Sequence, residues 1–82
     1  MENHPSDPTV FVPGKGELVV DTRQRIPGRV VDMWNGGAWL RPVAGGREWE
    51  ARVEHLRRPD TTEAIRARMA ELDHHSRAGR LR

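Results

Sequence analysis

The chain has 82 residues, of which 32% are charged, and it contains no cysteine. A chain this short forms one domain with a small core, and without cysteine it has neither disulfides nor thiolate metal ligands. It has no long apolar run, and residues 1–10 lack the basic-then-apolar pattern of a signal peptide. We therefore expect a cytoplasmic protein with no membrane partner.

The formal net charge is +2, and all basic side chains except Lys15 are arginine. Residues 1–54 hold 7 basic and 8 acidic side chains, a net charge of −1, whereas residues 55–82 hold 7 basic and 4 acidic, a net charge of +3. The basic surplus therefore lies in the C-terminal part, so any attraction to nucleic acid is local and moderate.

Residues 1–15 are rich in proline and polar side chains, and we expect a flexible N-terminal arm there. Phe11, the only phenylalanine, either packs onto the following domain or stays in the arm. The residue pattern leaves both possibilities open.

From Gly16 onward, short β-branched and aromatic runs alternate with glycine-bearing turns, which predicts a meander of antiparallel strands. The strands are expected at 18–20, 29–34, 38–41 and 47–53. A polar loop at 21–25 and a Pro27-Gly28 turn precede the second strand, an Asn-Gly hairpin turn follows it, and Gly45-Gly46 forms the next tight turn. Residues 16–59 are therefore predicted to form a small barrel.

A helix is predicted over residues 60–78, followed by a basic tail at 79–82. Asp60 and Glu63 have the spacing of a capping box, and Gly79 is a natural helix end. Ile65, Met69 and Leu72 form one apolar stripe. This stripe lies either on the barrel or in a partner.

The run GELVV at 16–20, a polar loop and the run GRVV at 28–31 resemble the opening of SH3-like barrels of the KOW and Tudor-like type. Residues 16–59 also resemble a family of small uncharacterised actinobacterial proteins, through the motifs LVVDT, LRP, GREWE and LRRP. The resemblance implies a mainly β fold: a four- to five-stranded antiparallel SH3-like barrel followed by one C-terminal α-helix. It also implies binding to RNA, to surfaces of the transcription or translation machinery, or to modified peptides.

The residue types do not favour catalysis. Serine occurs only at Ser6 and Ser76, so a nucleophile supported by a base is lacking. Glu48 and Glu50 share a predicted strand face. Such a pair is more often a solvated part of the surface than a site of acid–base chemistry. His74 and His75 are adjacent on a helix and diverge, which does not suit one metal ion. We expect no enzyme activity, no cofactor and no metal.

The tryptophans carry the main functional prediction. Strand alternation turns Ala38 and Leu40 inward and Trp39 and Arg41 outward, while Trp49 is expected in the core. Trp39 either packs beneath the helix, against Ile65 and Met69, or forms an exposed platform with Arg41 for a partner. The candidate partner-binding residues are Trp34, Trp39, Arg41, Ile65 and Met69.

Arginines provide the alternative site. A nucleic-acid surface would use the following residues of the barrel edge and of the segment before the helix: Arg23, Arg25, Arg29, Arg47, Arg57 and Arg58. Because residues 1–54 have a net charge of −1, we favour a non-enzymatic adaptor or regulatory module that docks on a protein partner. A nucleic-acid-binding protein is the alternative.

Overall fold

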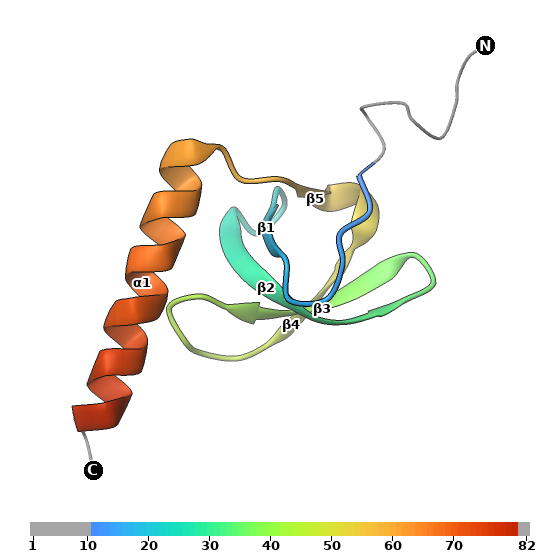
Figure 1. Cartoon of the computed structure of the whole chain (residues 1–82). Helices are drawn as coiled ribbons and strands as arrows, with labels where there is room; N and C mark the ends of the chain where they lie inside the picture. Colours follow the sequence, from blue (N-terminus) through green and yellow to red (C-terminus); the bar gives the residue numbers. More distant parts are fainter. Residues whose placement is uncertain (1–10, 81–82) are drawn as a thin grey trace.

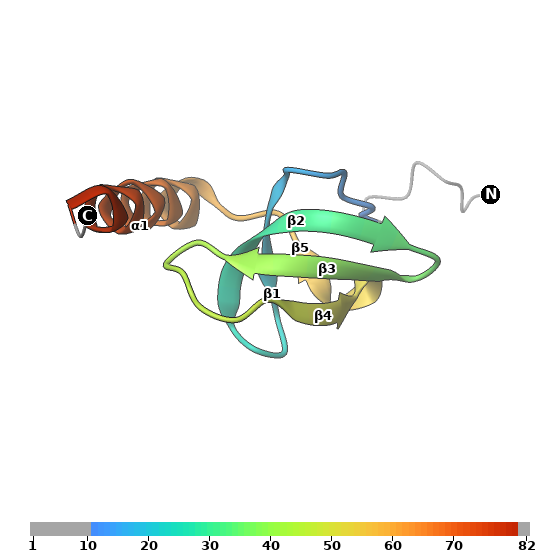
Figure 2. The same ribbon diagram turned by 90° about the horizontal axis from the view of Figure 1, so that it is seen from below.

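The computed structural model describes residues 11–80 (Figure 1). One antiparallel sheet with the strand order β4-β3-β2-β1-β5 curls into a half-barrel, and one helix follows it (Figure 2). The fold predicted from the sequence, a small SH3-like barrel with a C-terminal helix, is confirmed. Its elements are β1 (Leu18–Asp21), β2 (Ile26–Trp34), β3 (Gly37–Pro42), β4 (Trp49–Arg52), the 3-10 turn η1 (Val53–His55), β5 (Leu56–Arg57) and α1 (Thr61–Arg80).

The core draws side chains from all five strands. Its buried members are Val19, Val30, Ala38, Leu40, Ala51 and Leu56. The predicted alternation of β3 is present, since Ala38 and Leu40 are buried and Trp39 and Arg41 are exposed. Period-two alternation places one side of β3 in the core, so its outer side remains available for other contacts.

Phe11 packs against this core, which answers the question that the sequence left open. The Arg58 guanidinium lies 4.6 Å from the centre of the Phe11 ring, a cation–π contact. The ordered packing thus reaches further toward the N-terminus than the expected barrel start at Gly16. Residues 1–10 of the predicted flexible arm, and residues 81–82 of the predicted tail, lie outside the described residues.

The predicted Pro27-Gly28 turn is wrong, because both residues lie inside β2 and pair with β1. The chain reverses earlier, at 22–25, where Arg25 takes a φ of 64°. Gly28 is needed for close packing instead. A Cβ there would lie 2.8 Å from Trp49 Cη2 and 3.0 Å from the Arg41 carbonyl oxygen.

The hairpin between β2 and β3 forms as predicted, but its turn is not of type I′. Gly36 has a φ of 82°, whereas Asn35 keeps a negative φ, and a type I′ turn needs positive values at both positions. The next strand is also shorter than predicted. Residues 47 and 48 stay in the β3–β4 connection, and β4 begins at Trp49.

Helix α1 stands beside the barrel and meets it near β1 and the β3–β4 connection (Figures 1 and 2). The predicted capping box is present: the Glu63 amide donates to Asp60 Oδ1 at 2.8 Å, and the Asp60 amide donates to Glu63 Oε1 at 2.9 Å. The helix continues to Arg80, past the expected end at residue 78.

Small side chains of α1 make the contact with the barrel. Ala67 is buried against Leu18 and Val43, and Ala64 and Ala70 are packed beside it. The Ile65, Met69 and Leu72 side chains are 59%, 63% and 60% exposed. They lie on the opposite side of the helix, because residues three and four apart share a face. The stripe therefore does not lie on the barrel.

Candidate functional site

A β-bulge directs tryptophan side chains to the outer surface of the sheet. The β2–β3 register shifts between Val30 and Asp32, and an extra residue in one strand reverses which following side chains face inward. Met33 consequently packs against the core, while Asp32 and Trp34 are exposed. Trp34 and Trp39 thus share the outer surface of β2 and β3, and we call this surface, with Arg41, the tryptophan face.

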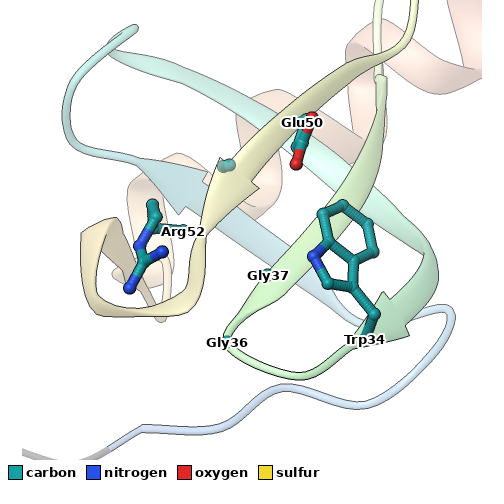
Figure 3. A pocket seen from close by; sticks show the side chains of 6 residues that line it. Trp34, Gly36, Gly37, Glu50 and Arg52 are labelled. Carbon is teal, nitrogen blue, oxygen red and sulfur yellow. The ribbon is translucent and has the colours of Figure 1, made fainter.

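The Trp34 indole lies over Gly37, its partner across the hairpin (Figure 3). A Cβ at Gly37 would lie 2.5 Å from Trp34 Cε2, so only glycine leaves room for the ring in this position. The indole is 43% exposed, and its N–H has no hydrogen-bond partner among the described residues. It is thus available to a partner as both an apolar surface and a donor.

Glu48 holds the other two side chains of the tryptophan face. Its Oε1 accepts a hydrogen bond from Trp39 Nε1 at 2.7 Å, and its Oε2 accepts one from Arg41 Nε at 3.0 Å. The Trp39 ring remains 37% exposed. It does not lie beneath α1, because the residues of α1 that pack on the barrel meet Leu18 and Val43 instead. One carboxylate therefore orients an indole and a guanidinium side by side.

A shallow pocket of about 250 Å³ borders the tryptophan face, lined by Trp34, Gly36, Gly37, Glu50, Ala51 and Arg52 (Figure 3). The charged side chains in and around the pocket are largely paired. Arg52 pairs with Glu54 at 3.3 Å, and on β2 Asp32 pairs with Lys15 at 3.4 Å. Glu50 makes no ion pair within the described part of the chain. The surface around the two indoles thus has no excess of positive charge to attract a polyanion.

Trp49 has a structural role, as predicted, although it is half-buried rather than fully buried. Its Nε1 donates to Asp21 Oδ2 at 2.7 Å, and Asp21 is only 2% exposed. The other oxygen, Oδ1, accepts the Arg23 and Gln24 amides at 2.8 and 3.1 Å. Asp21 therefore links the core to the turn at 22–25.

Three of the six predicted nucleic-acid arginines make ion pairs with carboxylates of this chain. Arg29 binds Glu71 of α1 through two hydrogen bonds, from Nε at 2.7 Å and from Nη2 at 3.1 Å. This contact raises the pKa of Arg29, and it lowers the pKa of the Glu71 carboxyl because the ion pair favours both charged forms. Arg29 consequently fastens the helix to the barrel.

Arg57 and Arg58 are also engaged. Both terminal nitrogens of Arg57 bind Glu63 at 2.7 Å. These bonds, together with the Asp60 amide, lower the pKa of Glu63 to about 2. Arg58 lies 3.5 Å from Glu17 as well as over Phe11. Within the described residues, Arg23, Arg25 and Arg47 of the predicted set make no ion pair.

Ile65 and Met69 belong to a separate surface, since they lie on the side of α1 that faces away from the barrel. The structure thus places Trp34, Trp39 and Arg41 on one surface of the sheet but leaves the helix stripe apart. Glu48 and Gly37, which position the tryptophan face, were not among the predicted site residues. The sequence shows two glycines after Asn35, but it does not show that the Trp34 indole covers Gly37.

Within residues 11–80, no cluster of three or more His, Asp or Glu side chains is placed to hold a metal ion. None of the described helices is long and apolar enough to cross a membrane. Comparisons with known proteins found no matching family model, no matching curated protein and no matching solved structure.

Proposed function

We propose that this protein is a non-enzymatic adaptor that docks on a protein partner through the tryptophan face. The observation that carries the proposal is the pair of exposed indoles on one side of a hydrogen-bonded sheet, 43% and 37% exposed. Tryptophan and arginine are enriched among the few residues that contribute most of the binding energy of protein interfaces. Because Glu48 and Gly37 already hold Trp39, Arg41 and Trp34 in place, docking costs little side-chain entropy.

The charges support a protein partner over nucleic acid. A nucleic-acid surface needs a cluster of free cations, whereas three of the six candidate arginines are committed to carboxylates of this chain. The similarity to KOW and Tudor-like barrels suggests a partner in the transcription or translation machinery.

The test is capture of partners from cell extract by the immobilised chain, followed by binding measurements with each purified candidate. Trp34→Ala and Trp39→Ala should each weaken binding by about 10-fold or more, since both remove a large contact side chain. Arg47→Ala is the matched control, because Arg47 is exposed and outside the tryptophan face. Binding should persist at about 0.5 M salt, where exposed charge pairs are screened.

A mobility-shift titration with single- and double-stranded DNA and RNA tests the alternative, which is nucleic-acid binding. We expect no shift at micromolar protein. A shift that disappears at moderate salt and in an Arg23→Ala/Arg25→Ala/Arg47→Ala variant, but persists in Trp39→Ala, would replace the proposal with nucleic-acid binding.

A further inference from the structure

A second pocket, of about 350 Å³, lies in the seam between α1 and the barrel. It exists because α1 contacts the barrel through alanines, whose short side chains leave the seam partly unfilled. Its lining is mostly apolar, made of Val20, Pro27, Val43, Ala44, Ala67 and Ala70. The volume is at the lower end of the range for small-molecule sites.

Two arginines from different elements line this pocket. Arg25 comes from the turn between β1 and β2, and Arg66 comes from α1. Neither makes an ion pair with any residue in the described part of the chain. The Arg25 amide donates to the Asp21 carbonyl oxygen at 2.6 Å, and buried Asp21 fixes the rest of this turn. The backbone of Arg25 is therefore held firmly at the pocket.

The third charged group at the pocket is already neutralised. Both Glu63 carboxylate oxygens accept hydrogen bonds from Arg57, and Oε1 also accepts one from the Asp60 amide. Glu63 therefore does not satisfy Arg25 or Arg66. Because Arg57 balances the charge of Glu63, Arg25 and Arg66 are the two charged lining residues left to bind an anionic group.

We propose that this pocket binds a small aliphatic monocarboxylate, with the hydrocarbon chain against Val20, Pro27 and Val43 and the carboxylate against Arg25 and Arg66. Guanidinium groups bind carboxylates through paired, charge-assisted hydrogen bonds, and the apolar wall takes the chain out of water. This site shares no residue with the tryptophan face. The proposed ligand site therefore goes beyond the proposed function, and each of the two can be tested without the other.

The test uses sodium hexanoate as the probe and the backbone amide NMR signals of the full ¹⁵N-labelled chain as the readout. We expect saturable shifts at Val20, Val43, Ala67 and Ala70, with a dissociation constant on the order of 1 mM, as befits so small a ligand. At equal ionic strength, 1-hexanol, which lacks the charge, and sodium acetate, which lacks the chain, should each bind about 10-fold more weakly or not at all.

Variants locate the site. Arg25→Asn, chosen because asparagine tolerates the positive φ, and Arg66→Gln should each weaken hexanoate binding by about 10-fold. Arg23→Gln is the control, since Arg23 lies in the same turn but does not line the pocket. Ala44→Leu should abolish binding by filling the pocket from an exposed position, without disturbing the core.

The proposal is overturned if hexanoate causes no saturable shift up to about 20 mM, a concentration well above the expected dissociation constant. It is also overturned if hexanol binds as well as hexanoate, or if Arg23→Gln weakens binding as much as Arg25→Asn. Trp34→Ala should leave hexanoate binding unchanged, so failure of this site and failure of the proposed docking face can be told apart.

Discussion

Replacing each of the three tryptophans by phenylalanine should cost very different amounts of stability. Trp49 donates its indole N–H to Asp21, a carboxylate that is only 2% exposed. Trp39 donates to Glu48 in an exposed position. Trp34 is 43% exposed, and its N–H has no partner among the described residues. The expected order of destabilisation is therefore Trp49, then Trp39, then Trp34.

The magnitude for Trp49→Phe follows from two losses. A hydrogen bond to a charged group contributes about 1.5–3 kcal/mol, and its loss leaves a buried carboxylate oxygen with one donor fewer. The indole edge that packs on Gly28 at Cη2 is lost as well, which adds about 0.5–1 kcal/mol. The sum is about 2–4 kcal/mol. For Trp39→Phe we expect about 0–1 kcal/mol, because exposed charged contacts contribute little, and for Trp34→Phe less than about 0.5 kcal/mol.

Urea and thermal unfolding followed by circular dichroism measure these differences. In a domain of this size, about 1 kcal/mol lowers the melting temperature by about 4–8 °C, so the loss of about 2–4 kcal/mol in Trp49→Phe should lower it by about 8–32 °C. Asp21→Asn should cost less in the Trp49→Phe background than in the wild type, since the two side chains interact. If Trp49→Phe is no less stable than Trp34→Phe, the reasoning from the buried hydrogen bond is wrong.

Three further predictions concern other parts of the fold. Gly28→Ala should destabilise the protein by about 1–3 kcal/mol, because the new Cβ meets Trp49 and the Arg41 carbonyl; Gly14→Ala, which meets nothing within 4 Å, is the control, and an equal loss of urea stability in both variants would refute the packing argument. In a carboxyl-carbon NMR titration, Glu63 should remain ionised at about pH 3, because its pKa is lowered to about 2 from 4.5. Since this pKa is lower in the folded state, Glu63 stabilises the fold above pH 4.5 and loses that contribution as the pH falls toward 2; if Arg57→Gln leaves the titration unchanged, Arg57 is not the main cause. Changing Ile65, Met69 and Leu72 together to glutamine should alter the unfolding free energy by less than about 1 kcal/mol, and a larger loss would mean that the stripe is buried in a second copy.

Local patterns were sufficient for most of the fold. The β-branched runs, the Asn-Gly turn and the Asp60–Glu63 capping box act over a few residues, so the sequence predicted the hairpin, the helix start and the inward side of β3. The Pro27-Gly28 turn failed for a physical reason. A glycine is required either where φ is positive or where another group approaches closely, and the group near Gly28 belongs to Trp49, far along the chain.

The candidate site shows the same division. The sequence by itself predicted that Trp39 and Arg41 face outward, because alternation along a strand is a local property. Only the tertiary structure placed Trp34 on the same surface, through a bulge that reversed the side-chain direction within β2. The side of α1 that meets the barrel was likewise decided by tertiary contacts. Ile65, Met69 and Leu72 form the apolar stripe, but the helix packs on the barrel through Ala67 on its opposite face. On that face Glu71 accepts hydrogen bonds from Arg29, which is 42 residues away in the sequence. Local periodicity carries no information about contacts at such a separation.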